Sequence, residues 1–336
     1  MKTLLRSKKK INIKSYVISI ILLMLIFAVK AQQLPLYSQY MMTGFLLNPA
    51  IAGSEGYTAF NLTAREQWLG WKNAPSTHAL SFQTRVLIAS YIAKSSKVQK
   101  EFLKPTSSGR VGLGGYIYND RSGIINRTGF QLAYAYHIHV HESQLSFGVS
   151  ATGFQFKIDE KKMTLYDNND PLVNGSDKVL FIPDANFGIF LSNAYYYAGI
   201  SVAQLFQSVL KFGKEKRITD YIMYRHYYLT AGYKLKVNSD FEIQPSLLVR
   251  TSKNLKFQVD INTRVYYRDS YWGGISYRTS GAIIFMSGIK IDKYYFGYAF
   301  DVTLNNIRKH SFGSHEVMMS LKIGDSARRY RWLNRY

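Results

Sequence analysis

Strict alternation of apolar and polar residues from Phe130 to Val140 constrains the fold of this chain more than any other feature. Apolar or aromatic side chains occupy every second position, namely Phe130, Leu132, Tyr134, Tyr136, Ile138 and Val140. The positions between them hold Gln131, Ala133, Ala135, His137 and His139, and His141 follows in phase. Side chains of a β-strand alternate between its two faces, so this pattern predicts a strand with one apolar and one polar face. Its length suits a tilted strand that crosses a bilayer.

Similar segments recur along the chain and together predict about fourteen strands, an even number as bacterial barrels require. They lie near residues 56–67, 76–90, 109–119, 128–141, 143–157, 184–192, 195–204, 224–237, 240–251, 255–267, 271–279, 281–291, 293–304 and 314–324. Short links such as Asn238-Ser239 alternate with longer ones, which include 158–183, 205–223 and 305–313. With a periplasmic N-terminus, the three longer links lie outside the cell, which is the usual asymmetry of outer-membrane barrels.

One link breaks this asymmetry. Residues 91–108 (YIAKSSKVQKEFLKPTSS) form a long, basic stretch that the strand count places on the periplasmic side. Either the count is off by one strand or this link has a structure of its own, and the sequence leaves both interpretations open.

A soluble β-sandwich would also contain many short alternating strands. The transmembrane barrel is favoured because one face of the predicted strands is almost uncharged while the other is small and polar. The chain also has 27 Tyr and 20 Phe at a mean hydropathy of −0.14, and such amphipathic rings are typical of the aromatic girdles of barrels. Unpaired backbone groups are costly in lipid, so the sheet must close. We therefore predict an all-β fold, a transmembrane antiparallel β-barrel over residues 56–324.

The N-terminus predicts export. Residues 2–14 are rich in Lys and Arg without an acidic residue, and Tyr16 to Val29 (YVISIILLMLIFAV) is nearly pure hydrocarbon. Such a run is shorter than the roughly 20 residues of a membrane-spanning helix and has the length of a signal-peptide core. Small residues at Val29 and Ala31 predict cleavage after Ala31, so residues 1–31 would be a cleaved signal peptide. An uncleaved membrane anchor is the alternative.

Charge and cysteine content narrow the function classes. The net charge is +22, and loss of the seven Lys and Arg residues up to Lys30 lowers it to +15. In an exported chain this charge would face lipopolysaccharide, lipid headgroups or another protein rather than nucleic acid. The chain has no Cys, which excludes disulfides, thiolate catalysis and thiolate metal sites.

No residue cluster predicts a cofactor, a metal or an enzyme. His137, His139 and His141 share a strand face, but no acidic residue or Cys joins them there, so a polar lumen wall is the simpler interpretation. The acidic residues Asp167, Asp170, Asp177 and Asp184 lie in and beside the 158–183 link without EF-hand spacing. No G-x-S-x-G motif is present. We expect neither catalytic residues nor a bound cofactor.

Residues 32–85 carry a specific resemblance. The stretches QQLPLYSQYMMTGFLLNPAIAG (Gln32 to Gly53) and REQWLGWKNAPSTHALSFQT (Arg65 to Thr84) resemble the start of the PorP/SprF family, outer-membrane proteins of the type IX secretion and gliding machinery of Bacteroidota. The residues that carry the resemblance are Gln39, Tyr40, Asn48, Pro49, Ala52, Gly53, Gln67, Trp68, Pro75, Thr77 and Ser81. The long 91–108 link departs from the family. The resemblance implies a fourteen-stranded barrel that helps a secreted adhesin or effector to reach, or stay on, the cell surface.

The residues of the first stretch also have a structural interpretation. Tyr37, Tyr40, Met41 and Phe45 fall at helical spacing, which predicts a short helix before a turn at Asn48-Pro49 and Gly53. Within a segment 32–55, such a helix could plug the barrel lumen or lie in the periplasm. Its motif residues would then pack the barrel mouth or contact a partner. After the last strand, residues 325–336 form a basic, aromatic tail.

Two function classes follow. The first is a binding and assembly component of type IX secretion, with a secreted surface protein, other machinery components and outer-membrane lipid or lipopolysaccharide as partners. The second is an outer-membrane channel or small-molecule transporter, which only the barrel itself favours, because a fold does not determine a function.

Cleavage after Ala31 is testable. Mass spectrometry of the mature protein is expected to find Gln32, or its cyclised form, at the N-terminus, because the apolar run is too short to serve as an anchor. Recovery of an intact Met1 from outer membranes would contradict the prediction.

Overall fold

Long antiparallel strands dominate the computed structural model, which describes residues 37–86, 109–158, 179–210, 221–252 and 255–323. All of them belong to one unit of the chain, Gln33–Tyr336. The long strands are β1 (Thr58–Glu66), β2 (Ser76–Val86), β3 (Val111–Ser122), β4 (Ile125–Val140), β5 (Ser143–Ile158), β6 (Val179–Ser192), β7 (Tyr196–Ala203), β10 (His226–Tyr233), β12 (Phe241–Ser252), β13 (Leu255–Tyr267), β14 (Tyr271–Arg278), β15 (Ala282–Ile291), β16 (Tyr294–Thr303) and β17 (Ser314–Ile323).

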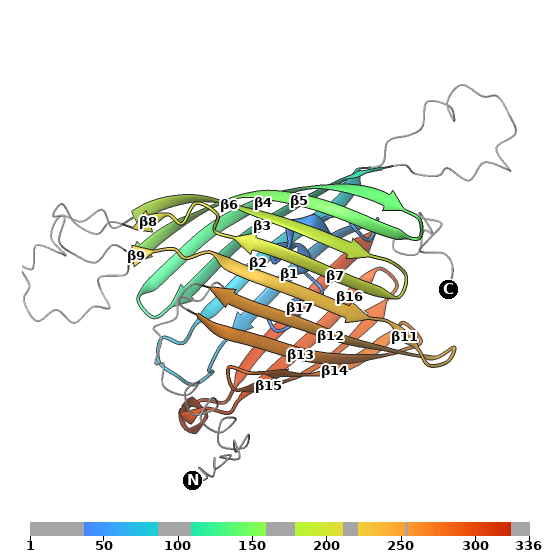
Figure 1. The fold of residues 1–336 in the computed structure, drawn as a ribbon. Helices are drawn as coiled ribbons and strands as arrows, with labels where there is room; N and C mark the ends of the chain where they lie inside the picture. The colour runs from blue at the N-terminus through green and yellow to red at the C-terminus, as the bar shows by residue number, and fades with distance from the viewer. Residues whose placement is uncertain (1–36, 87–108, 159–178, 211–220, 253–254, 324–336) are drawn as a thin grey trace, which may run out of the picture. The chain divides into compact units, whose positions relative to one another are not determined.

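These strands form one closed sheet (Figure 1). Each pairs with its neighbours in chain order, β10 pairs with both β7 and β12, and β1 pairs with β17. A two-residue strand, β11 (Leu235–Lys236), continues the line of β10 beside β12. The described strands therefore make a fourteen-stranded antiparallel barrel, and the predicted fold class and strand count are confirmed.

The barrel has an apolar outside and a polar inside, the reverse of a soluble protein. On β4, Leu132 is 61% exposed and Tyr134 is 45% exposed, whereas the neighbouring Gln131 and Ala133 are buried. The same alternation runs along β1, where Phe60 and Leu62 point outward and Asn61 and Arg65 point inward. Lipid solvates the outer face, so only the inner face needs polar partners within the protein.

The links fall into two groups at the two ends of the barrel. At the end where β1 begins, which we call the turn end, short links join β4 to β5, β6 to β7, β13 to β14 and β15 to β16. At the opposite end, the loop end, β1 is followed by β2, β5 by β6, β7 by β10 and β16 by β17 after longer links, and short links join β3 to β4 and β14 to β15. Since outer-membrane barrels have short periplasmic turns, the loop end corresponds to the cell exterior.

The structure corrects two expected links. The 205–223 link carries a small ladder of its own, β8 (Val209–Leu210) with β9 (Tyr221–Ile222). The 158–183 link is shorter than expected, because β6 extends back to Val179 beside β5. The 91–108 link lies outside the described residues; of the strands on either side of it, β2 ends and β3 begins at the turn end.

The predicted short helix around Tyr37–Phe45 is wrong in form. Turns cover residues 38–43, and two 3-10 helices follow, η1 (Gly44–Leu46) and η2 (Pro49–Ile51). Asn48 is extended between them, because a residue before proline is disfavoured in the helical conformation. A third 3-10 helix, η4 (Asn306–His310), lies in the loop between β16 and β17. In the described part of the chain, no helix has the length and apolar character to cross a membrane.

Neighbouring positions in the middle of β10 test which face meets lipid. Leu229 is 44% exposed on the outside, and Thr230 is buried and borders an internal cavity. Leu229→Arg is expected to destabilise the barrel by about 2–4 kcal/mol, the cost of an arginine near the bilayer midplane. Thr230→Arg is expected to fold better, because its side chain can extend into the cavity. The measurement is the folded fraction after refolding into lipid vesicles; equal damage from both variants would contradict the assignment of the two faces.

Candidate functional site in the barrel lumen

Residues 37–56 lie inside the ring of strands and run antiparallel to β1. Ser38 contacts Arg65, near the loop end of β1, whereas Gly53 contacts Gln83 and Arg85, beside the start of β1. In chain direction, residues 37–56 therefore run from the loop-end part of the lumen to the turn end, where β1 begins. Residues 37–56 are called the lumen segment below.

A buried ion cluster holds the tip of the lumen segment. Arg65 Nη2 lies 2.6 Å from Asp301 Oδ2, and Arg65 Nη1 lies 3.1 Å from Glu316 Oε2. The Glu316 carboxylate accepts hydrogen bonds from the backbone N–H groups of Ser38 (2.7 Å) and Gln39 (2.9 Å). The Ser38 hydroxyl contacts both oxygens of Asp301 and the guanidinium of Arg65. Charge-assisted bonds of this kind are stronger than neutral ones, so the first described residues are tightly anchored.

The middle of the segment packs against small residues of the wall. Phe45 is fully buried and forms one apolar cluster with Ala79, Ala133 and Ala135. In the same cluster, the hydroxyl oxygens of Tyr37 and Tyr116 are 2.5 Å apart. Either hydroxyl can donate in this hydrogen bond. Apolar packing and this hydrogen bond together hold the segment against the wall.

Two lumen-facing glycines make room for the turn at Asn48. A Cβ on Gly148 would lie 2.1 Å from the backbone nitrogen of Ala50, and a Cβ on Gly188 would lie 2.0 Å from Asn48 Oδ1. The Asn48 side chain donates to the carbonyl oxygens of Ile189 (2.9 Å) and Ile200 (3.3 Å), on two adjacent strands. The segment therefore touches the wall at a distance that only glycine allows.

Polar side chains of the wall bind the backbone of the segment near the turn end. Arg85 donates to the Gly53 carbonyl oxygen (3.2 Å), Gln144 donates to the Ser54 carbonyl oxygen (3.2 Å), and His137 Nε2 lies 3.1 Å from the Ala52 carbonyl oxygen. A carbonyl oxygen can only accept, so His137 donates from Nε2. These bonds satisfy carbonyl groups that would otherwise be buried without partners.

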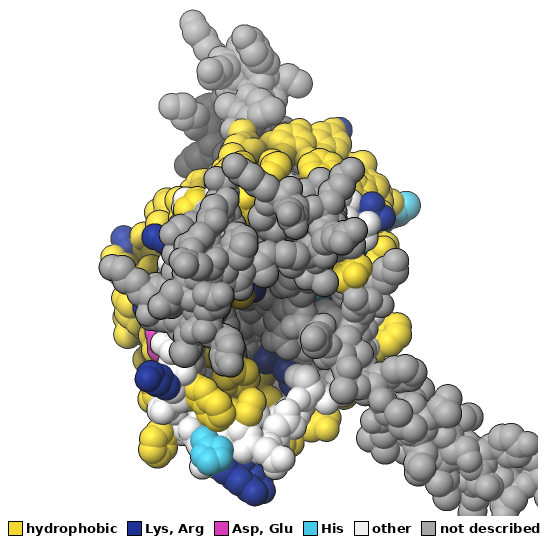
Figure 2. All heavy atoms as spheres, turned by 90° about the vertical axis from the view of Figure 1, so that its left-hand side faces the viewer, with side chains coloured by type: hydrophobic (Ala, Val, Ile, Leu, Met, Phe, Trp, Pro, Cys, Tyr) yellow, Lys and Arg dark blue, Asp and Glu magenta, His cyan; other side chains and the backbone are white. Residues whose placement is uncertain are grey.

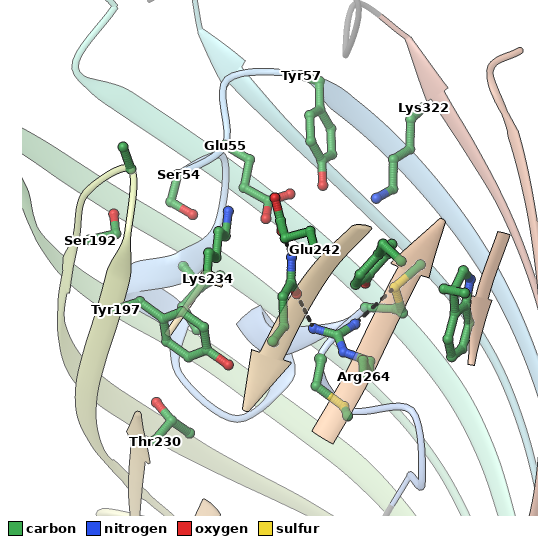
Figure 3. Close-up of a pocket in the computed structure, with 18 of the residues that line it drawn as sticks. Ser54, Glu55, Tyr57, Ser192, Tyr197, Thr230, Lys234, Glu242, Arg264 and Lys322 are labelled. Carbon is green, nitrogen blue, oxygen red and sulfur yellow. Dashed lines mark hydrogen bonds between the residues drawn. The ribbon is translucent and has the colours of Figure 1, made fainter. Parts of the chain in front are cut away.

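A cavity of about 640 Å³ remains between the lumen segment and the wall on the turn-end side. Figure 3 shows Glu55 of the segment and Glu242 of the wall pointing toward each other, with Lys234 beside them and Lys322 on the opposite side. Its lining includes five Lys or Arg and three Asp or Glu side chains together with many aromatic rings, namely Lys234, Lys236, Arg264, Lys290, Lys322, Glu55, Glu242, Asp269, Tyr40, Tyr57, Phe190, Tyr195, Tyr197, Tyr266, Trp272 and Tyr295. Its size is within the range of ligand pockets.

The structure separates the predicted motif residues into two groups. Those inside the barrel are Gln39, Tyr40, Asn48, Pro49, Ala52, Gly53, Thr77 and Ser81, and all of them are buried. Gln67, Trp68 and Pro75 lie in the β1–β2 loop at the loop end and are half-buried. Thr77 donates to Asp120 (2.8 Å), and Ser81 accepts from Asn61 (3.0 Å), so both brace the wall.

The three predicted histidines are not brought together. His137 is buried and bound to Ser146 and Ala52, whereas His139 and His141 are exposed at the turn end. Among the described residues, no group of three His, Cys, Asp or Glu side chains is placed to hold a metal ion. Asp167, Asp170 and Asp177 lie outside the described residues, and Asp184 accepts from the backbone of Phe206 (3.0 Å).

Sequence reasoning missed the residues that anchor the lumen segment. Arg65, Asp301 and Glu316 each lie at an inward position of a strand, where a charged side chain in an alternating pattern is a detectable signal. Their mutual contact was not detectable, because it depends on the pairing of the first strand with the last.

Comparison with known proteins now decides the family. The family model described as "Type IX secretion system membrane protein PorP/SprF" matches residues 29–321. The chain belongs to this family. It is therefore an outer-membrane component of type IX secretion, and the family is one of secretion-system barrels rather than of enzymes.

Solved structures of outer-membrane proteins are similar to this PorP/SprF protein at low sequence identity. The outer-membrane protein Omp33 of Acinetobacter baumannii is 6% identical, with a TM-score of 0.41, over 80% of this chain and 98% of its own. CdiB from Acinetobacter baumannii is 8% identical, with a TM-score of 0.41, over 79% of this chain and 60% of its own. A mutant porin of Rh. blastica is 7% identical, with a TM-score of 0.32, over 80% of this chain and 99% of its own. No curated protein matches the chain.

The glycine contacts predict how the lumen segment responds to added bulk. Gly148→Ala places a methyl group against the backbone of Ala50 and is expected to destabilise the folded barrel by about 1–3 kcal/mol, as overpacking does. Gly115→Ala is the matched control, because a Cβ there meets no atom within 4 Å. Denaturant unfolding in detergent micelles measures both. Equal stability of the two variants would contradict the close packing of the segment.

Proposed function

We propose that this protein assists the secretion or surface attachment of a specific adhesin or effector. In this proposal the barrel binds a partner protein, and its lumen is blocked and does not act as a channel. The observation that carries the proposal is the anchoring of the lumen segment from Ser38 to Ser54 by side chains around the wall. A diffusion channel needs a continuous water-filled lumen. The anchored segment occupies that space and leaves a cavity on the turn-end side.

The proposed partners are a secreted surface protein, other components of the secretion machinery, and outer-membrane lipid or lipopolysaccharide; nucleic acid is not among them. Membership in the family supports the first two. The loop end faces a protein that has just left the cell, so we place the contact with the secreted protein there. We also propose that the chain has no enzymatic activity.

We keep the predicted organisation of the chain as part of the proposal. Residues 1–31 form a cleaved signal peptide, 32–55 a segment that plugs the lumen, 56–324 the barrel, and 325–336 a basic tail. The motif residues inside the barrel would then have a structural role in seating the segment. Gln67, Trp68 and Pro75 would shape a loop at the exterior.

Deletion of the gene tests the proposed role. Surface display of one or a few secreted proteins is expected to disappear, because the barrel is dedicated to them, while other secretion and small-solute uptake continue. Quantitative proteomics of the cell surface and the medium, beside solute uptake rates, measures both. Normal secretion with a lost uptake would favour the alternative, an outer-membrane channel or transporter.

Conductance in planar bilayers separates the closed barrel from a channel. The wild-type protein is expected to show no sustained conductance. Arg65→Met leaves two buried carboxylates without their main cation, which costs about 3–5 kcal/mol, and openings are expected as the segment detaches. Arg268→Met is the control, because Arg268 pairs with Asp240 at the surface (3.0 Å), where a pair contributes at most about 1 kcal/mol. A steady wild-type conductance would overturn the closed-barrel proposal.

A further inference from the structure

Two links at the loop end, together with the end of β3 and the turn after it, form one connected surface, which we call the rim platform. It consists of residues 67–75, 121–124 and 304–313. The backbone N–H of Leu69 donates to the Gly313 carbonyl oxygen, and the N–H of Phe312 donates to the Leu69 carbonyl oxygen, each at 2.8 Å. The N–H of Gly123 donates to the Asn73 carbonyl oxygen (3.2 Å). These hydrogen bonds join separate hairpins, so they hold the platform together as one surface.

Large apolar side chains of the rim platform are exposed. Phe312 is 77% exposed, and Leu69 and Trp71 are each 47% exposed. Trp71 meets the His310 ring edge-on, with centroids 6.0 Å apart, and Trp68 and Trp71 border a hollow that Ile307 also lines. Exposed aromatic rings at the rim of a barrel lie at the level of the lipid headgroups.

The charge of the rim platform has one sign. Lys72, Arg121, Arg308 and Lys309 are exposed, and the three segments contain no Asp or Glu. Acidic side chains on the adjoining strands have partners: Glu66 lies 3.5 Å from His78, and the buried Asp120 accepts a hydrogen bond from Thr77. The buried Asp301 and Glu316 pair with Arg65. Figure 2, which views the loop end, shows hydrophobic, basic and histidine side chains together along the lower rim, where Figure 1 places the β16–β17 loop.

We propose that the rim platform binds the phosphate groups of outer-leaflet glycolipid, with Lys72, Arg308 and Lys309 facing the phosphates and Trp71 and Phe312 beside the apolar chains. A phosphorylated glycolipid joins an anionic head to acyl chains, and the platform joins cations to exposed rings. Cations of this kind strengthen attachment to anionic lipid surfaces. The inference rests on the proposed lipid contact but not on the proposed secretion role.

Lipid A carrying two phosphates, and the same lipid A after removal of its phosphates, serve as probes for the full mature protein in detergent. Native mass spectrometry and a titration measure binding. The wild type is expected to prefer the phosphorylated form. The variant Lys72→Gln, Arg308→Gln, Lys309→Gln is expected to bind it at least about tenfold more weakly.

The matched control removes the same charge from exposed residues at the turn end, as Arg110→Gln, Arg268→Gln, Lys293→Gln, and is expected to bind like the wild type. Heat-modified migration on gels checks that each variant folds. Trp71→Ala with Phe312→Ala is expected to weaken binding while keeping the preference for phosphate.

Three outcomes would overturn the proposal: equal binding of both lipid forms, unchanged binding by the rim variant, or an equal loss in the turn-end control. If the rim variant keeps lipid binding but loses an acidic secreted protein from the cell surface, the platform is a protein docking surface instead. Normal secretion in the deletion strain together with phosphate-specific lipid binding would remove only the proposed secretion function.

Discussion

The whole structure depends on the pairing of β1 with β17. In lipid, the edge of an open sheet would leave a row of N–H and C=O groups without partners, so the ladder from Thr58 to Glu66 must find the last strand. That ladder places Arg65 directly opposite Glu316. The ion pair between them, extended to Asp301 on β16, lies inside the seam. The strand pairing that closes the sheet therefore also assembles the side chains that bind Ser38 and Gln39.

The interior shows how a barrel holds a peptide that has almost no regular structure. The lumen segment cannot join the sheet, so its buried backbone groups need other partners. Side chains from distant strands supply them: Glu316 at the tip, Gln131 beside Phe45 (3.4 Å), Ser201 at Leu47 (2.6 Å) and Arg85 near the turn end. These four hydrogen bonds are made to backbone atoms of the segment, so they depend little on its side chains. The fit of the segment's shape depends instead on Gly148 and Gly188, because a side chain at either position would collide with the turn at Asn48.

The sequence predicted the barrel well, because the period of two records directly which side of each strand meets lipid. All fourteen strands were predictable, and the outward positions of β4 were assigned correctly. The form of the lumen segment was not predictable, because Tyr37, Tyr40 and Phe45 are at helical spacing but are held by the wall and not by an intrahelical ladder. The family motif located Gln39 and Asn48, yet their burial follows from contacts with residues more than a hundred positions away. Charged residues at inward positions, such as Arg65, were visible in the sequence without their partners.

The order of the chain adds a consequence for biogenesis. During vectorial export the lumen segment emerges first, whereas Asp301 and Glu316, which bind its tip, emerge near the end. Until then Met41, Met42 and Phe45 have no buried site and are exposed to periplasmic chaperones and proteases. A product truncated before Asp301 would lack the carboxylates that bind Ser38 and Gln39. Seating of the segment therefore requires a chain that extends past Glu316.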